Sequence, residues 1–306
     1  MDDFYRSFEE KHRGSRDLIK PRFEIYLPFI VPLKQTESLP AAIDLGCGRG
    51  EWLELLSEHG FDPQGVDLDE GMLEACRHLH LKVEKKDALS ALASLSDESM
   101  GVVSGFHIAE HLPFDVLRDL VKEALRVLKP GGILILETPN PENVVVGTSA
   151  FYLDPTHVKP VPQELLAFIA EYSGFYRVKI VRLQENKELM ASSEPNLLDV
   201  LYGVSPDYAV VAQKIADEET LSCFDAPFAE EYGLSLEALS ARYDQRIALM
   251  RSQLVQALTE ARQARIFAQE LQRGYESLLH SRSWRLTAPL RSFGMILRSI
   301  KNFLIR

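Results

Sequence analysis

Three histidines lie where side chains could carry out acid–base chemistry. His107 and His111 follow a short apolar run that ends at Phe106, and His157 lies in a long polar segment. A neutral imidazole accepts protons near neutral pH, so each ring could deprotonate a hydroxyl group that acts as a nucleophile. Packing or helix capping is the simpler role for a single histidine, so the position of each ring in the fold has to show whether it is catalytic or structural.

His157 is the preferred general base. Its polar segment lies where a lid over a substrate would form, and Asp154, three residues earlier, could orient the ring. His111 and Glu110 begin the turn into the next predicted helix, where capping and packing are common. We therefore predict that His157, Asp154 and His111 act in catalysis, and His111 or Glu110 stays open as the base in place of His157.

A glycine-rich turn supplies a second kind of chemistry. It follows the apolar run at residues 41–45, and a helical pattern begins directly after it at Glu51. Glycines there allow positive φ and let a ligand approach the backbone, at the sheet edge where open α/β folds bind ligands. The turn lacks the spacing of phosphate-binding loops. The residues predicted to contact a ligand are Gly46, Cys47, Gly48 and Gly50.

Two acidic residues end neighbouring predicted strands beside this turn. Asp67 could accept two hydrogen bonds from the hydroxyl groups of a ribose, and Asp44 suits a positively charged ligand. A cofactor with ribose and a cationic centre but no pyrophosphate points to S-adenosylmethionine. Arg13 and Arg16 precede the first strand and could pair with the carboxylate of the cofactor, although solvation at the surface is the alternative role.

Seven short apolar runs alternate with helical patterns between residue 40 and about residue 215. This alternation is typical of an α/β fold with a mostly parallel sheet and crossover helices. An amphipathic helical cap over residues 1–34, ending near Pro28 and Pro32, precedes them. The predicted strands are residues 41–45, 63–67, 82–85, 101–106, 132–137, 176–182 and 208–213. The clearest predicted helices are residues 51–59, 71–79, 114–128 and 162–172.

Five motifs occur in the order and spacing of one enzyme family, at residues 44–50, 65–67, 87–88, 110–112 and 128–132. In this the chain resembles class I S-adenosylmethionine-dependent methyltransferases over about residues 40–215. The resemblance implies a Rossmann-like, doubly wound, mostly parallel seven-stranded sheet with an antiparallel final strand. It also implies that the methionine part lies over the glycine turn and the ribose on Asp67. Further cofactor contacts are expected at Leu68, Asp87, Ala88, Phe106 and His107.

Further segments resemble methyltransferases of bacterial O-antigen and other surface-polysaccharide systems. They are residues 4–6, 13–16, 137–141, 151–157 and 283–290. This resemblance implies O-methylation of a sugar hydroxyl, often at the end of a growing chain, where the methyl group stops elongation. Some relatives add a kinase domain, but this sequence contains neither an HRD nor a DFG motif. A methyltransferase for a quinone-like small molecule, and a non-catalytic scaffold that keeps the fold, are the alternatives.

The residues that follow predict a long helix. Proline is absent from residues 228–288, and apolar or alanine positions recur in steps of three and four. Such a heptad seam favours a coiled coil, here over residues 236–280, and hence a homo-oligomer. A single helix packed on its own globular domain is the alternative, because the small side chains of the seam alanines contribute little to packing between helices of a coiled coil. The seam consists of Met250, Leu254, Ala257, Ala261, Ala264, Ala268, Leu271, Tyr275 and Leu278.

Charge divides the chain unevenly. Residues 277–306 carry six basic and no acidic residues, which leaves 28 basic against 45 acidic residues in the remainder. The basic residues of the tail alternate with apolar positions, which predicts an amphipathic helix, over residues 281–306, that binds an anionic membrane surface or a partner protein. Its apolar positions are Leu290, Phe293, Leu297, Ile300 and Leu304. Residues 35–216 form the predicted catalytic domain and residues 217–235 a linker.

Overall composition restricts the remaining function classes. The net charge of -11 disfavours nucleic acid as a substrate. Cys47, Cys76 and Cys223 show no metal-ligand spacing and no disulfide framework, so we expect no metal site and a reducing compartment. The sequence has no stretch resembling a signal peptide or a membrane span. We therefore expect a cytoplasmic protein, held peripherally on the inner face of the cytoplasmic membrane.

Overall fold

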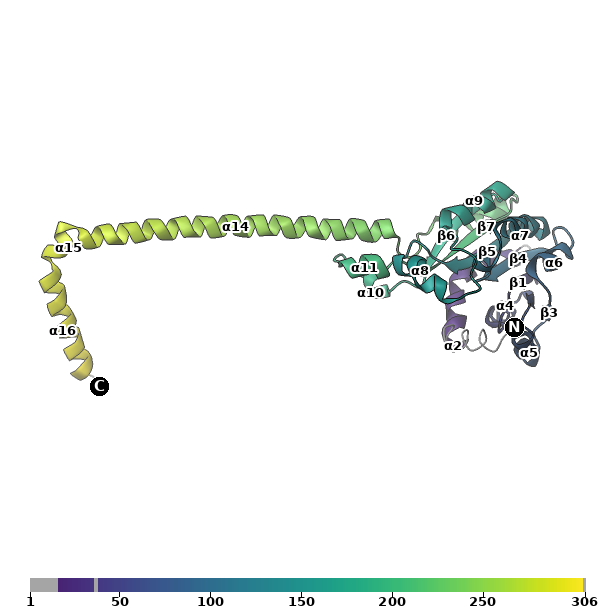
Figure 1. The fold of residues 1–306 in the computed structure, drawn as a ribbon, viewed down its shortest axis with the longest axis horizontal. Coiled ribbons are helices and arrows are strands. Elements are labelled where there is room, and N and C mark those ends of the chain that lie inside the picture. Colours follow the sequence, from purple (N-terminus) through teal and green to yellow (C-terminus); the bar gives the residue numbers. More distant parts are fainter. Residues whose placement is uncertain (1–15, 36–37, 305–306) are drawn as a thin grey trace. The chain divides into compact units, whose positions relative to one another are not determined.

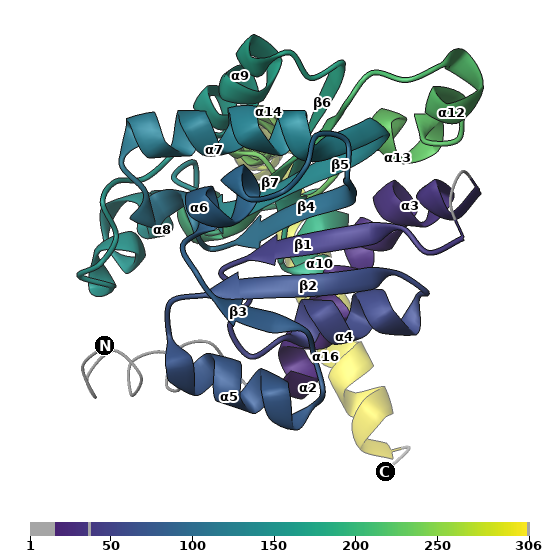
Figure 2. The same ribbon diagram turned by 90° about the vertical axis from the view of Figure 1, so that its right-hand side faces the viewer.

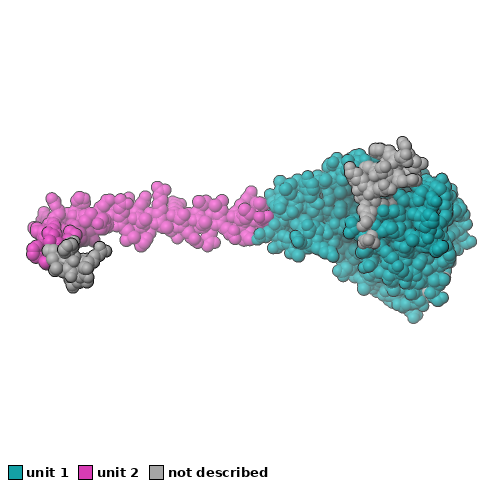
Figure 3. Space-filling model, turned by 90° about the horizontal axis from the view of Figure 1, so that it is seen from below, with its two compact units in different colours: residues 1–243 teal, residues 244–306 magenta. Residues whose placement is uncertain are grey.

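The computed structural model describes residues 16–35 and 38–304. Two motifs used above, Phe4-Tyr5-Arg6 and the Arg13 end of residues 13–16, lie outside these ranges. The chain divides into two compact units, Met1–Tyr243 and Asp244–Arg306, each of which is described by itself (Figure 3).

A seven-stranded sheet forms the centre of the first unit (Figure 1). Its order is β3-β2-β1-β4-β5-β7-β6, and β7 runs antiparallel to both of its neighbours. The predicted fold, including the antiparallel final strand, is confirmed. The strand order reverses between β1 and β4, the place where open α/β sheets bind ligands. The strands are β1 (Ala41–Leu45), β2 (Asp62–Asp67), β3 (Val83–Lys85), β4 (Met100–Phe106), β5 (Leu128–Pro139), β6 (Arg177–Leu183) and β7 (Asp207–Gln213).

Helices cover both faces of the sheet (Figure 2). Successive side chains of a strand point to opposite faces, so Val103 of β4 packs in one core while Val102 and Phe106 pack in the other. The first face carries α6 (Ala88–Ala93), α7 (Phe114–Val127) and α9 (Gln163–Ser173). The second carries η1 (Lys20–Tyr26), α3 (Leu27–Ile30) and α4 (Glu51–Glu58), and α5 (Glu70–His78) packs beside β2 and β3.

The segment before β1 is helical but broken. Instead of one amphipathic helix, residues 16–35 form α2 (Arg16–Ile19), η1, α3 and η2 (Val31–Gln35). Pro21 and Pro28 stand at the first turns of η1 and α3, because proline lacks the N–H that a continuous helix would need. Phe23 and Tyr26 are buried there, and the Phe23 ring lies 4.5 Å from the ring of Phe106. This segment therefore completes the core of the second face.

β5 is longer than predicted. The residues between the predicted helix 114–128 and the predicted strand 132–137 lie inside this strand, because Leu128 pairs with Met100 before the register shifts and Ile133 pairs with Val102. Gly131 has a φ of 77°, which lets the strand bulge there. The connections at the carboxyl edge contain η3 (Ala109–His111), α8 (Val144–Thr148), η4 (Ala150–Leu153), α10 (Lys187–Ala191) and α11 (Leu197–Tyr202).

Residues 217–235, predicted as a linker, pack against the first unit. They form α12 (Glu218–Ser222) and α13 (Asp225–Ala229), and the side chains of Phe224 and Leu234 are buried. Arg177 of β6 donates to the Leu221 carbonyl and to the Asp225 carboxylate. The segment thus belongs structurally to the sheet domain.

The second unit is helical. α14 (Leu236–His280) begins in the first unit and continues into the second, followed by α15 (Arg282–Leu286) and α16 (Ala288–Leu304). The predicted long helix is confirmed. The large apolar seam side chains, from Met250 to Leu278, are more than half exposed. Among the described helices, none combines the length and apolar content needed to cross a bilayer.

Candidate active site

The glycine turn after β1 adopts a conformation that requires glycine. Gly46, Gly48 and Gly50 have φ values of 73°, 51° and 80°. A Cβ at Gly50 would lie 2.5 Å from the Leu81 side chain and 3.0 Å from the sulfur of Cys76. Both the positive φ and the close packing therefore exclude larger residues at Gly50.

The backbone amides of this turn are used within the fold. Those of Gly46 and Cys47 donate to the Val66 carbonyl, and that of Gly50 donates to the Cys47 carbonyl. Gly48 donates to Oδ2 of Asp67 at 2.9 Å. A loop that binds pyrophosphate presents a row of such amides to its ligand, and these four do not.

Asp67 ends β2 with its carboxylate held in place. Oδ1 accepts from the amide of Asp69 at 2.8 Å, while Oδ2 accepts from Gly48. Each oxygen of a carboxylate has a second lone pair, so both can still accept a hydroxyl proton. The side chain is half-buried. This is the geometry expected of a residue that binds the two hydroxyl groups of a ribose.

Asp44 lies next to the end of β1 and belongs to a chain of buried, hydrogen-bonded polar side chains. Ser104 of β4 donates its hydroxyl to Oδ1 of Asp44 at 2.7 Å, and Trp52 of α4 donates its indole N–H to Ser104 at 2.9 Å. Asp44 is 2% exposed. The three residues fix a carboxylate next to the glycine turn, where it favours a positively charged ligand.

The other predicted cofactor residues surround the same edge. The Arg16 guanidinium donates to the Arg49 carbonyl and to Glu54, each at 2.5 Å, which places it against the turn. Asp87 caps α6 by accepting from the Ser90 amide, and Leu68 is exposed. The Phe106 side chain packs into the aromatic core of the second face. The structure thus leaves only the backbone of Phe106 at the strand end.

His107 lies at the end of β4 between two carboxylates. Its Nδ1 is 3.2 Å from Glu110 and its Nε2 is 3.4 Å from Glu137. Burial disfavours the charged ring, but the hydrogen bonds to the two glutamates outweigh it and raise the pKa of His107 well above its usual range. The residue has a φ of 54°, in the left-handed region that few residues other than glycine adopt.

The polar segment after β5 brings His157 to the same edge. Its ring centroid is 4.7 Å from that of His111, and Nδ1 is 2.6 Å from the Phe151 carbonyl. Asp154, predicted to orient this ring, has its carboxylate 3.7 Å from Nε2 and accepts from the amide and hydroxyl of Thr156. The closest partner that orients the ring is therefore the Phe151 carbonyl.

Several residues at this edge were not singled out from the sequence. Tyr26 donates its hydroxyl to Glu137, Thr138 donates to Glu110 at 2.8 Å, and Asp207 begins β7. Burial raises the pKa of Asp207 to about 6. A signal existed for Asp207, because an antiparallel final strand starts at the edge where the parallel strands end. Tyr26 offered none, since it lies 111 residues from its partner.

Known proteins share both the sequence and the fold of this site. Residues 43–136 match the family described as a methyltransferase domain. The crystal structure of a SAM dependent methyltransferase from Archaeoglobus fulgidus is 36% identical, with a TM-score of 0.61. The match covers 69% of this chain and all of that one. The chain belongs to the S-adenosylmethionine-dependent methyltransferases.

Two curated relatives have informative names. A protein of Mycolicibacterium smegmatis, named as an S-adenosylmethionine-dependent methyltransferase, is 28% identical over 57% of this chain and 65% of its own length. A ubiquinone biosynthesis O-methyltransferase of Methylococcus capsulatus is 35% identical over 32% of this chain and 43% of its own length. The chain therefore spans less than two thirds of either relative.

The cofactor of this methyltransferase is S-adenosylmethionine, and the turn fits it. The turn carries no side chain at Gly46 and Gly48, Asp67 presents two oriented oxygens, and Asp44 supplies negative charge. When bound, the cofactor supplies an electrophilic methyl group on a positively charged sulfur. The protein's own task is then to place the acceptor.

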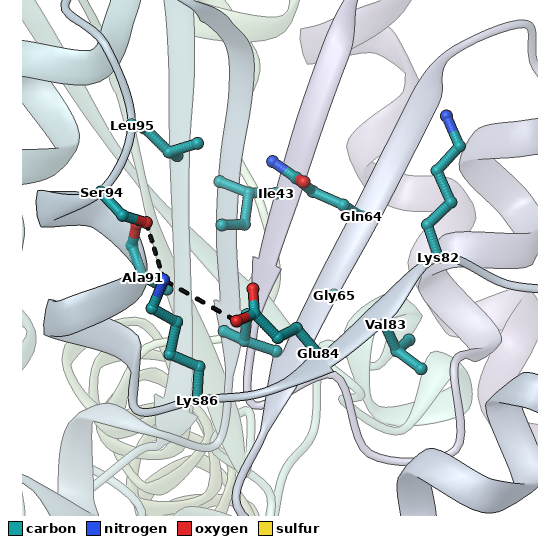
Figure 4. A pocket seen from close by; sticks show the side chains of 11 residues that line it. Ile43, Gln64, Gly65, Lys82, Val83, Glu84, Lys86, Ala91, Ser94 and Leu95 are labelled. Carbon is teal, nitrogen blue, oxygen red and sulfur yellow. Dashed lines mark hydrogen bonds and ion pairs between the residues drawn. The ribbon is translucent and has the colours of Figure 1, made fainter.

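A hollow of about 270 Å³ lies elsewhere in this methyltransferase domain (Figure 4). Residues of β2, β3 and α6 line it, and the Lys86 amine lies 2.9 Å from Ser94 and 3.9 Å from Glu84. Its lining contains no predicted catalytic or cofactor residue. The ends of the strands, rather than this hollow, therefore define the candidate active site.

Replacing Asp67 by alanine is expected to weaken binding of S-adenosylmethionine about 10- to 100-fold. Hydrogen bonds to a charged acceptor contribute roughly 1.5–3 kcal/mol each, and water recovers part of the loss. Calorimetry of the full chain measures the change. Glu70→Ala is the matched control, because this acid is exposed and pairs with Arg77 at the surface. Equal affinities in Asp67→Ala and the wild type would refute the assignment.

Proposed function

We propose that this methyltransferase O-methylates a sugar hydroxyl of a bacterial surface polysaccharide. The observation that carries the proposal is the His111–His157 pair, which lies at the carboxyl edge of the sheet with the glycine turn and Asp67. A sugar hydroxyl is a weak nucleophile until its proton is drawn off, and nitrogen lone pairs at this edge serve that step.

The lone pairs sit on the Nε2 atoms. Nδ1 of His157 donates to the Phe151 carbonyl, so its Nε2 accepts. Burial lowers the pKa of His111, and the neighbouring His157 adds to this effect, so the His111 ring is neutral near pH 7. A ring nitrogen that can take up a proton at this edge suits an O–H acceptor, which has to lose a proton during transfer.

The segment around His157 also suits a carbohydrate. Tyr152 is 64% exposed, and its ring packs against that of Phe151, which in turn contacts the His157 ring. Aromatic rings can cover the C–H face of a sugar, while the nearby Asp154 and Thr156 offer hydrogen bonds to its hydroxyl groups. A methyl ether on the terminal sugar removes the oxygen to which the next sugar would be added. We propose that methylation in this way limits chain length.

A quinone precursor is the second candidate acceptor. It is favoured by the name of the Methylococcus capsulatus relative, which is a ubiquinone biosynthesis O-methyltransferase. The exposed apolar side chains near the site, Leu153 and Val158, also suit such an acceptor. Incubation of the purified chain with S-adenosylmethionine and either a catechol or isolated glycan separates the two proposals.

Mass spectrometry of surface glycan tests the leading proposal. Cells that lack the protein are complemented with the wild type or with Asp67→Ala. We expect glycan methyl groups to be lost without the protein, to return with the wild type, and to stay low with the variant. A methyl content that does not change on deletion contradicts the proposal. Wild-type chain that binds no S-adenosylmethionine by calorimetry would instead favour a scaffold.

The C-terminal helices are proposed to hold the enzyme where its acceptor is made. Arg291 stacks on Trp284 at 3.7 Å, and Leu290 and Phe293 are exposed. A basic amphipathic helix of this kind binds the surface of an anionic membrane. We further propose that the exposed seam of α14 pairs with a second copy as a coiled coil. Binding of the tail to a polysaccharide-assembly protein is the alternative.

Deletion of residues 284–306 is expected to move the protein from the membrane pellet to the soluble fraction. Each basic residue near an anionic surface contributes about 1 kcal/mol, so the attraction weakens as salt rises. Fractionation at low and high salt measures this. Arg262→Glu with Arg265→Glu in α14 is the control for charge alone and should stay bound. Deletion that leaves the distribution unaltered rejects the anchor.

A further inference from the structure

We propose that Glu110, His111 and His157 form a binding site for a divalent first-row transition cation. One potential ligand atom from each side chain lies within 4.8 Å of the other two. Metal–nitrogen and metal–oxygen bonds of about 2.0–2.2 Å place neighbouring ligand atoms roughly 3–4 Å apart. The three ligand atoms would therefore have to move closer together to hold an ion.

The Nδ1 side of each imidazole is already fixed. The Thr156 hydroxyl donates its proton to Asp154 at 2.6 Å, so toward Nδ1 of His111, at 3.1 Å, it can only accept. Nδ1 of His157 donates to the Phe151 carbonyl. Both Nδ1 atoms thus act as donors, which leaves Nε2 as the nitrogen of each ring that an ion could bind. Ring partners of this kind fix the tautomer of metal-bound histidines.

Glu110 supplies the negative charge. Its side chain is fully buried, and Thr138 donates to Oε2 at 2.8 Å. Nδ1 of His107 lies 3.2 Å from the other oxygen, Oε1, and each carboxylate oxygen keeps a second lone pair that an ion could use. The amide of Val158 donates to the Glu110 carbonyl at 2.8 Å. This bond joins the two chain segments that carry the three side chains.

The neighbouring cluster of His107, Glu137 and Asp207 has similar residue types but a different state. Both ring nitrogens of His107 are already engaged by carboxylates, Nδ1 by Glu110 at 3.2 Å and Nε2 by Glu137 at 3.4 Å. This ring therefore has no nitrogen left for a metal ion. The contrast assigns the cation to the cluster in which both histidines offer Nε2.

Two imidazoles and one carboxylate favour Zn²⁺, Mn²⁺, Fe²⁺ or Co²⁺ over Mg²⁺, which prefers oxygen ligands. The role of the ion rests on the proposed function. With the ion bound, the Nε2 lone pairs would hold the metal instead of taking up the proton. The cation would bind the acceptor hydroxyl and lower its pKa, so that the O–H bond breaks, an oxygen–metal bond forms, and the proton leaves to water. The binding site itself does not depend on which acceptor is used.

Cobalt titration of the untagged full-length chain tests the site. After dialysis against a chelator, we expect one Co²⁺ per chain, seen by its visible absorption and displaced by Zn²⁺, and a higher Tm with the metal bound. His111→Ala with His157→Ala should lower affinity more than about 100-fold. Thr156→Val, which removes the hydroxyl that pairs with Nδ1 of His111 and with Asp154, should lower it about 10-fold.

His78→Ala is the matched control, because His78 is an exposed histidine on α5. It should bind cobalt like the wild type. Circular dichroism reports whether each variant is folded, and Thr156→Val keeps the test informative if the double variant is not. The proposal is overturned if the wild type binds no more cobalt than the double variant. It is also overturned if Thr156→Val leaves the affinity for cobalt unaltered. Glycan methylation that persists in chelated enzyme overturns the cation's role and leaves the proposed function standing.

Discussion

Replacing His157 by alanine is expected to lower the rate of methyl transfer about 10²- to 10⁴-fold. The substitution removes the Nε2 lone pair beside the acceptor, and assistance by a general base is typically of this size. Affinity for S-adenosylmethionine should stay within about twofold, because the ring contacts Phe151 and His111 rather than the glycine turn. Single-turnover kinetics with saturating cofactor, together with calorimetry, separate the two effects.

The rate of methyl transfer by His157→Ala is to be compared with the rates of His111→Ala and His78→Ala. The His111 ring also lies near His157, but its Nδ1 pairs with the Thr156 hydroxyl rather than with a main-chain carbonyl. A turnover of His157→Ala within threefold of the wild type would remove His157 from the role. If the wild type stays fully active after chelation while His157→Ala is impaired, then the imidazole itself takes the proton.

The sheet could be predicted from the sequence because its signals are local. Each strand is a short apolar run, and the glycine turn stands directly between a strand and a helix, so spacing alone located β1, Gly46 and Asp67. β5 was underestimated because Pro130 and Gly131 usually mark a turn. Here they lie in a bulge held by pairing with β4.

The chemistry at the edge depends on contacts that are distant in sequence. His157 approaches His111 from 46 positions away, and a carbonyl rather than Asp154 holds its ring. Tyr26 reaches Glu137 only because prolines fold the N-terminal segment across the second face. Residue types identify these side chains as candidates for catalysis. Which ring nitrogen of His111 and His157 acts as a donor follows only from their partners in the folded chain.

Replacing Trp52 by alanine is expected to destabilise the first unit by about 3–5 kcal/mol, the usual cost of removing a buried large aromatic side chain. Trp52 is 1% exposed, and its ring packs against Phe23, Tyr26 and Phe106 at centroid distances of 5.4–6.1 Å. The loss should also weaken cofactor binding, because Ser104 then lacks the donor that fixes it on Asp44.

Trp52→Phe separates packing from hydrogen bonding. It keeps an aromatic ring but loses the indole N–H, so we expect about 1–3 kcal/mol of destabilisation and a comparable defect in cofactor affinity. Urea unfolding followed by circular dichroism gives the stability, and Trp284→Ala in the second unit should leave it within about 0.5 kcal/mol. If Trp52→Ala binds S-adenosylmethionine like the wild type, the buried chain from Trp52 to Asp44 stabilises the fold without shaping the site.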